Sequence, residues 1–351
     1  MSAEAATLLP LAAVESPSRV RSAVRTAWGV TTLVVLLSVL AAVPLVNVLV
    51  FGYLLEAQGR IARGARLRDA FAGFDELPRL GSALVLTWLW VFPVRLLSNL
   101  AADAALINSG GALSVVRWLV AAAVGAHLVW AWAKGARPGD FIRPWRTQSE
   151  PWRFDIPLRR IAGLGFGAAL ATLCWLAVPV GLMVLARTGP GHPPLALLGG
   201  ALLLPVLAWL PSLQVQFAVS GRWRALFDWR GARAVATKAP VATFAALVAL
   251  YVFTLPLYLL KAVLPPSDAA WLVTLVFIVT VVPMRIAVAK AYGRGVRAAA
   301  PSSWPLRWIP RLVLVPLLIA YAALLFLSPL IDSHGSAGLF AQHALLLPAP
   351  F

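Results

Sequence analysis

Residues 195–219 read LALLGGALLLPVLAWLPSLQVQFAV, a run of 25 residues without one charged side chain. A helix needs about 20 mostly apolar residues to cross a bilayer, so this stretch is long enough to span one. In lipid, a single segment can satisfy its backbone hydrogen bonds only by forming a helix. The stretch therefore predicts a transmembrane α-helix.

Seven further apolar runs of similar length occur along the chain. The full set is Trp28–Leu55, Gly81–Leu100, Ala112–Ala133, Ile161–Ala186, Leu195–Val219, Val241–Leu264, Ala270–Tyr292 and Leu312–Ile331. The chain is 61% hydrophobic and 12% charged, against roughly 45–50% and 25% in soluble domains. The sequence thus predicts an all-α, polytopic transmembrane helical bundle with seven or eight hydrophobic helical segments.

The charged residues are distributed unevenly between these runs. The net charge of +17 would fit a nucleic-acid binder, but the lysines and arginines gather in a few short connections. The basic connections are Glu56–Leu80, Lys134–Arg160, Ser220–Pro240 and Gly293–Arg311. By the positive-inside rule, we expect these loops to be cytoplasmic in a multi-pass protein of the cell (cytoplasmic) membrane. We do not expect nucleic acid as a partner.

The path of the first run stays open between two topologies. Trp28–Leu55 has Pro44 near its middle, and proline kinks or breaks a helix. The run can form a re-entrant hairpin, which we favour and which leaves seven crossings, or it can cross once. We expect 1–27 to be a flexible cytoplasmic segment, 28–331 a transmembrane domain and 332–351 a tail on the non-cytoplasmic side.

The sequence contains no pattern that predicts enzymatic chemistry. Cys174 is the only cysteine, the four histidines lack metal-ligand spacing, and no serine has a suggestive histidine and acid. Residues 161–170, IAGLGFGAAL, follow no strand and precede no acid, so they predict a small-residue packing face instead of a dinucleotide loop. We therefore predict a protein that is not an enzyme and that binds no cofactor or metal.

Ionisable residues inside apolar runs are costly and often functional. In this chain they are Arg95, Arg117, Lys261, Arg285 and Lys290. Arg95 and Arg285 are the deepest, and each follows a proline by two residues. A guanidinium there could bind the carbonyls that a proline frees, or an anion. These two residues are our candidates for an anion or lipid site, with snorkelling or structural pairing as the alternative.

Tryptophan and arginine are mixed in the loop Ser220–Pro240. The residues that we expect to contact headgroups are Arg222, Trp223, Arg224, Trp229 and Arg230. Such mixtures bind single-stranded nucleic acid in some proteins, but beside transmembrane helices they favour an amphipathic segment on anionic lipid. The predicted partners are therefore a bilayer with anionic headgroups and, as candidates, other membrane proteins.

Two short patches resemble the domain of unknown function 4013 family (DUF4013). The first is Phe51-Gly52-Tyr53-Leu54-Leu55, an arginine-bearing helix end near Arg60, and Phe74-Asp75-Glu76-Leu77; the second is Gly221–Pro240 around Phe227-Asp228-Trp229-Arg230. The chain departs from the family pattern at Arg79 and Leu80, where a more acidic run is expected. The resemblance implies a bacterial or archaeal polytopic membrane protein and transfers no activity.

These observations favour a non-enzymatic scaffold, assembly or accessory component of a membrane. The alternative is a transporter or channel for an anion or lipid, in which Arg95 and Arg285 would line the path.

Overall fold

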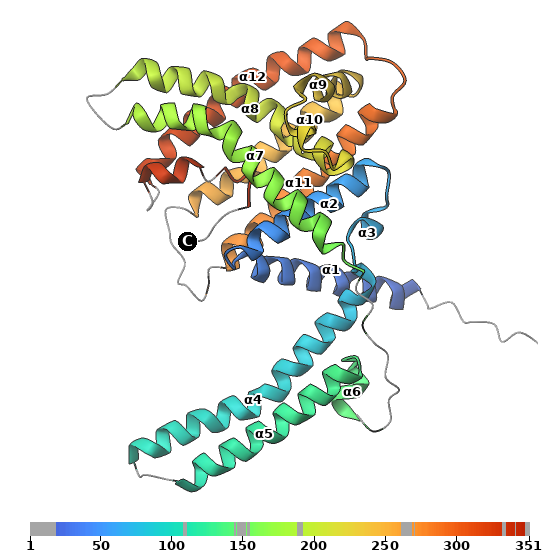
Figure 1. Ribbon diagram of the computed structural model, residues 1–351, viewed down its shortest axis with the longest axis vertical. Coiled ribbons are helices and arrows are strands. Elements are labelled where there is room, and N and C mark those ends of the chain that lie inside the picture. Colours follow the sequence, from blue (N-terminus) through green and yellow to red (C-terminus); the bar gives the residue numbers. More distant parts are fainter. Residues whose placement is uncertain are drawn as a thin grey trace, which may run out of the picture. The chain divides into compact units, whose positions relative to one another are not determined.

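The computed structural model describes residues 19–107, 111–143, 145, 152, 155–187, 192–260, 269, 271–331, 335–340 and 342–347. Within these residues the chain forms α-helices and short 3₁₀ helices and no strand (Figure 1). Eight helices, namely α1, α4, α5, α7, α8, α10, α11 and α12, are long and apolar enough to cross a membrane. The predicted all-α, polytopic class is confirmed. Lys261 and residues 1–18 lie outside the described residues.

The helices follow one another along the chain in this order. They are α1 (Arg19–Ala41), α2 (Val46–Ala62), α3 (Leu67–Ala70), α4 (Leu77–Ile107), α5 (Gly111–Lys134), α6 (Pro138–Ile142), α7 (Leu158–Leu185), α8 (Pro193–Ser220), α9 (Trp229–Lys238), α10 (Pro240–Leu259), α11 (Trp271–Arg297) and α12 (Trp304–Leu327). The first nine residues of α1 belong to the segment 1–27, which we expected to be flexible.

The first apolar run is broken into two helices. α1 ends at Ala41 and α2 begins at Val46, with Pro44 between them and Leu45 in a left-handed conformation at φ 65°. Asn47 Nδ2 donates to the carbonyl oxygen of Ala41 at 2.9 Å, which satisfies an acceptor that the end of α1 leaves free. Proline and this amide together stabilise the break.

The beginning of α1 lies beside the beginning of α4. The Arg25 guanidinium donates to the carbonyl oxygen of Asp75 at 3.3 Å, and Trp28 Nε1 donates to the carbonyl oxygen of Pro78 at 3.1 Å. Residues 75–78 therefore lie beside residues 25–28, which precede them by 50 positions. Whether the first run crosses the membrane once or forms a re-entrant hairpin stays a prediction.

The chain divides into two compact units, and the first comprises residues 1–32 and 75–152. Its helices α4 and α5 run side by side as a hairpin, and α6 packs against both of them (Figure 1). The buried core of this unit is small and consists of Ala83, Ala131, Ala136 and Phe141. His127 Nε2 lies 3.0 Å from the carbonyl oxygen of Phe141, which links α5 to α6.

The second unit comprises residues 33–74 and 153–351, and α2 lies in its interior. Eleven of the 17 residues of α2 are buried, because α7, α8 and α11 all pack against it. Glycines allow these close approaches. Gly165 of α7 faces the backbone of Val48, Gly59 faces the backbone of Ala218 in α8, and Gly293 of α11 faces the backbone of Ala62. Gly165 confirms the predicted packing face in residues 161–170.

The end of the chain folds back into the second unit. We call residues 342–347 the C-terminal segment. Gln342, His343, Ala344 and Leu345 are all at most 5% exposed. Residues 332–351 were expected to form a tail, but this part of them is buried among the helices. The side of the membrane from which the segment enters stays a prediction.

Candidate functional site

Arg285 lies at the centre of a buried polar group in the second unit. Its side chain is supplied by α11 and is 3% exposed. Nη2 donates to Gln214 Oε1 of α8 at 2.6 Å, and Nη1 donates to the carbonyl oxygen of Leu345 at 3.3 Å. Gln214 Nε2 donates to Thr172 Oγ1 of α7 and to the same carbonyl oxygen, both at 2.9 Å. We call Thr172, Gln214, Arg285 and the Leu345 carbonyl the polar centre.

All partners of the Arg285 guanidinium in the polar centre are neutral. The aromatic ring of Phe51 lies 5.0 Å from it, and no carboxylate among the described residues forms an ion pair with it. Burying a charge without a counter-ion is costly, so the hydrogen bonds that Arg285 donates to Gln214 and to the C-terminal segment must offset that cost. This geometry is that of structural pairing, which is one of the predicted roles of Arg285. The carbonyl groups that accept from its guanidinium belong to the C-terminal segment.

A cluster of tyrosines adjoins the C-terminal segment. Tyr258 and Tyr321 lie 3.1 Å apart through their hydroxyl oxygens, Tyr251 donates to the carbonyl oxygen of Leu207, and the His343 ring lies 4.9 Å from that of Tyr258. The chain has five tyrosines, and three of them meet here. Because tyrosine is rare in this chain, the positions of its few tyrosines are the sequence signal that could have indicated this cluster.

We expect the Arg285→Leu substitution to release the C-terminal segment. Charge-assisted hydrogen bonds contribute about 1.5–3 kcal/mol each, so labelling of a buried probe should rise about tenfold or more. The probe is Leu345→Cys in a Cys174→Ser background, treated with a maleimide. Lys290→Leu, which removes an exposed cation from the same helix, should leave the labelling low. Equal protection in both variants would contradict this role of Arg285.

Glu56 forms a second buried polar group, which the sequence analysis missed. It is 3% exposed. Its carboxylate lies 3.0 Å from Arg60 Nε, 2.7 Å from Arg160 Nε and 3.6 Å from Arg63 Nη2. Burial lowers the pKa of Arg63, and the Glu56 charge counteracts this shift. The apolar run ends at Leu55 and so predicts a loop at Glu56, whereas α2 continues to Ala62.

The arginines around Glu56 also hold the end of α8. Arg63 and Arg160 both donate to the carbonyl oxygen of Ala218 at 3.3 Å, and cations are favourable at a helix C-terminus. Arg297 of α11 donates to the carbonyl oxygen of Ala62 at 3.3 Å. The ends of α2, α8 and α11 and the beginning of α7 therefore meet at one end of the second unit.

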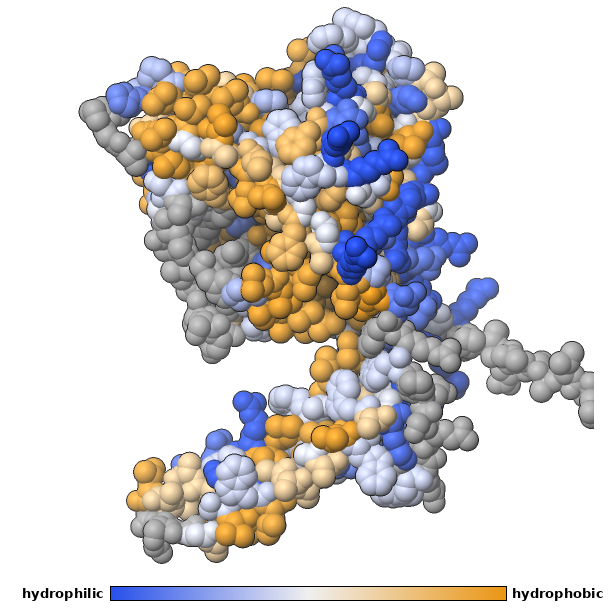
Figure 2. Space-filling model, viewed as in Figure 1, coloured by the Kyte–Doolittle hydropathy of each residue, from blue (hydrophilic) through white to orange (hydrophobic). Residues whose placement is uncertain are grey.

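The predicted headgroup residues lie on the 3₁₀ helix Trp223–Leu226, on the residue directly before it and on α9. All five predicted residues, Arg222, Trp223, Arg224, Trp229 and Arg230, are exposed, whereas Ala232 and Ala236 are buried. The Asp228 carboxylate accepts from the backbone N–H of Gly231 at 3.0 Å and caps α9. This element is amphipathic, as predicted, and we call its exposed side the basic face. In Figure 2 hydrophilic side chains gather along one edge of this unit.

The two candidate arginines of the apolar runs lie in different units. Arg95, on α4 of the first unit, is exposed and makes no hydrogen bond or ion pair with any residue that the structure describes. Arg117, on α5, lies 4.8 Å from the ring of Trp118. Whether Arg95 or Arg285 binds an anion stays a prediction.

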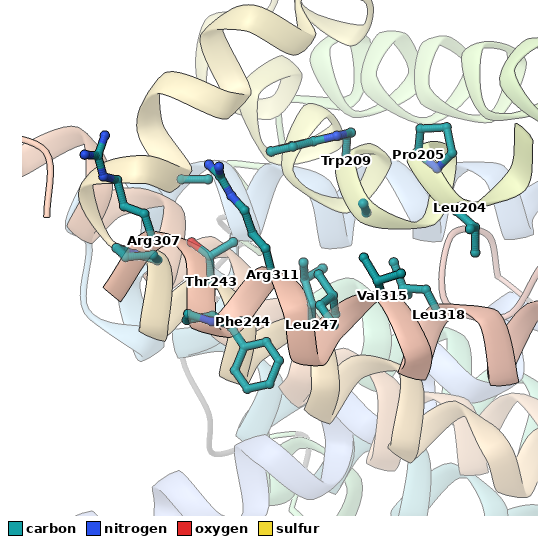
Figure 3. Close-up of a pocket in the computed structure, with 15 residues that line it drawn as sticks. Leu204, Pro205, Trp209, Thr243, Phe244, Leu247, Arg307, Arg311, Val315 and Leu318 are labelled. Carbon is teal, nitrogen blue, oxygen red and sulfur yellow. The ribbon is translucent and has the colours of Figure 1, made fainter. Parts of the chain in front are cut away.

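An apolar groove runs between α8, α10 and α12 in the second unit. It begins as a cavity of about 280 Å³ with Arg307 and Arg311 at one end (Figure 3). A second cavity, of about 670 Å³, continues between α7, α8 and α12. Both cavities share Leu204. No single stretch of sequence indicates this groove, because its walls come from four separate apolar runs.

Comparisons with protein-family models, with characterised proteins and with solved structures find no match to this chain. The resemblance to the DUF4013 family therefore stays a prediction. Within the part of the chain that the structure describes, no three histidine, cysteine or acidic residues are grouped so that they could hold a metal ion.

Proposed function

We propose that this multi-pass helical protein is a non-enzymatic scaffold, assembly or accessory component of a membrane. In this proposal the α4–α5 hairpin docks onto a membrane-spanning helix of another protein, and the basic face rests on anionic headgroups. The observation that carries the proposal is Arg95, an exposed cation without a partner among the described residues, on the α4–α5 hairpin of the first unit.

In this proposal the α4–α5 hairpin spans the bilayer, and Arg95 then lies deep within it. The 24 residues of α5 span about 36 Å, close to the roughly 30 Å of the hydrocarbon core. Arg95 precedes Ile107, the last residue of α4, by 12 residues, or about 18 Å. An arginine near the bilayer centre costs about 2.5–3.5 kcal/mol or more. Arg117 is about 9 Å from the beginning of α5, so its side chain can reach the interface.

Among the candidate spans that the structure describes, no carboxylate lies at the depth of Arg95. Across the eight candidate spans, the acidic residues are Asp75, Glu76 and Asp103. The first two lie at the beginning of their span, and Asp103 follows Arg95 by eight residues, about 12 Å along the helix. In this proposal the carboxylate at the depth of Arg95 comes from another molecule.

The surface of the hairpin is consistent with a docking role. Only 11% of the apolar window of α4 and 6% of that of α5 are buried, against 39–44% for α7, α8, α10 and α11. Trp88, Leu89 and Phe92 are each more than half exposed. Close packing against a partner helix would add van der Waals contacts to the ion pair with Arg95.

We expect Arg95→Leu to lower the amount of a stoichiometric membrane partner about tenfold or more, because charge-assisted hydrogen bonds contribute about 1.5–3 kcal/mol. The measurement is affinity purification from native membranes in a mild detergent, with quantitative mass spectrometry. Arg117→Leu removes one positive charge from the same hairpin and should leave the yield of the partner unchanged.

Two results would contradict the docking role. One is purification of the unaltered protein without any stoichiometric partner. The other is equal recovery of the partner with both variants. If a partner is found, its spanning helices should contain an aspartate or glutamate. Arg95→Asp combined with the reverse change in the partner should then restore the complex.

Arg285 supports a second candidate function, transport of an anion or lipid. A buried guanidinium with neutral partners would attract an anion once the C-terminal segment withdraws. This function requires the Leu345→Cys probe to become reactive during uptake into vesicles that contain the unaltered Arg285. A probe that stays protected while uptake proceeds would rule out a path through the polar centre.

A further inference from the structure

The groove between α8, α10 and α12 has a charged end and an apolar length. Arg307 and Arg311 lie one turn apart on α12, and Figure 3 shows them together at one end of the cavity. Leu247, Val315 and Leu318 follow along the groove away from them. A groove with a basic end and an apolar length matches a molecule with an anionic head and a hydrocarbon chain.

The arginines at this end have no acidic partner among the described residues. Arg307 Nε is buried without a hydrogen-bond partner there, and the Arg311 guanidinium contacts the ring of Trp308 at 5.7 Å. Two arginines that line one cavity end without a carboxylate partner among the described residues form an anion-binding arrangement, and arginine in particular matches the geometry of phosphate.

The groove is long enough to take a hydrocarbon chain. From Arg311 to Phe326, which lines the second cavity, α12 extends 15 residues, or about 22 Å. Pro205 and Pro310 line the first cavity, and their short rings leave space that a larger side chain would fill. A free inorganic anion would use only the charged end and would leave the apolar length empty.

The charged end of the groove also has the features of a membrane interface. Arg307 is the fourth residue of α12, and Trp304 and Trp308 beside it are exposed. Tryptophan is enriched where a helix passes the headgroups. A phosphate bound by Arg307 and Arg311 would thus lie at headgroup level, with its acyl chain directed into the bilayer.

We propose that this groove binds one anionic phospholipid, with its phosphate between Arg307 and Arg311 and an acyl chain along Leu247, Val315 and Leu318. The site is separate from the α4–α5 hairpin, so it does not depend on the docking role. It is a defined pocket for a single lipid, in contrast to the basic face, where any anionic headgroup could bind.

The test uses the full-length protein in nanodiscs of phosphatidylcholine with a minor fraction of phosphatidylglycerol that carries a diazirine on one acyl chain. After photolysis, mass spectrometry locates the cross-links. We expect them to be concentrated on α10 and α12 around Leu247, Val315 and Leu318. Arg307→Gln combined with Arg311→Gln should lower this labelling about tenfold or more.

The matched control is Arg222→Gln combined with Arg224→Gln, which removes the same charge from the basic face and should leave labelling of the groove unchanged. Ala208→Phe, which fills the groove and keeps the arginines, should lower the labelling as well. Because Ala208→Phe and the arginine variant alter different parts of the groove, misfolding of one leaves the other as a test. Equal labelling by diazirine-bearing phosphatidylcholine, or unchanged labelling in the arginine variant, would overturn the proposal.

Discussion

Gly165→Ala is expected to destabilise the second unit by about 3 kcal/mol or more. A Cβ at Gly165 would collide with the backbone of Val48 in α2, and Gly52 of α2 faces the backbone of α7 in the same way. Backbone cannot move aside as a flexible side chain can, so α2 and α7 must separate. Overpacking costs about 1–3 kcal/mol and occasionally more, and we expect the upper end here.

Gly163→Ala is the matched control for this substitution. Gly163 lies two residues away on α7, and an added Cβ would meet nothing within 4 Å. Alanine favours a helix over glycine by about 1 kcal/mol, so this variant should be neutral or slightly stabilised. The measurement is unfolding of the purified protein in detergent by heat or sodium dodecyl sulfate. Equal stability of the two variants would show that α2 and α7 are not in close contact.

Glu56→Gln is expected to destabilise the protein by about 2–3 kcal/mol. Removing one partner of a buried ion pair costs about 3–5 kcal/mol. We expect a smaller loss of unfolding free energy here because the side chains of Arg60, Arg63 and Arg160 are 29–45% exposed and water screens their charges. The substitution leaves three arginines close together at the ends of α2 and α7 without the carboxylate that neutralises them.

Salt distinguishes this mechanism from a simple packing defect. Repulsion among partly exposed arginines is screened by ions, so the stability lost in Glu56→Gln should become smaller between low and high ionic strength. Asp69→Asn, which removes an exposed acid from α3, should change the unfolding midpoint little at any salt concentration. A loss that is independent of salt would indicate that Glu56 acts through hydrogen bonding alone.

The sequence by itself determined the fold class and the approximate positions of the spanning helices. Run length and hydropathy suffice for this, because lipid requires every crossing segment to satisfy its own backbone. Pro44 likewise indicated the break between α1 and α2, since proline disrupts a helix locally. The amphipathic character of residues 220–240 also followed from local sequence, because tryptophan and arginine are mixed there.

Tertiary structure alone distinguished Arg95 from Arg285. In the sequence the two are alike, since each lies inside an apolar run two residues after a proline. In the structure Arg95 is exposed, whereas Arg285 is bound by Gln214, 71 residues away, and by the backbone of Leu345, 60 residues away. No local pattern encodes partners at such separations.

The same reason explains why the sequence did not reveal the burial of Glu56, the packing of the C-terminal segment or the groove. Glu56 follows an apolar run and would be a loop residue if α2 were judged by its own sequence, but the neighbouring helices bury it. The carbonyl oxygen of the buried Leu345 accepts hydrogen bonds from Gln214 of α8 and Arg285 of α11. Hydropathy measures how each segment interacts with lipid, whereas these sites depend on which side chains of different segments meet, and only the packing of the helices decides that.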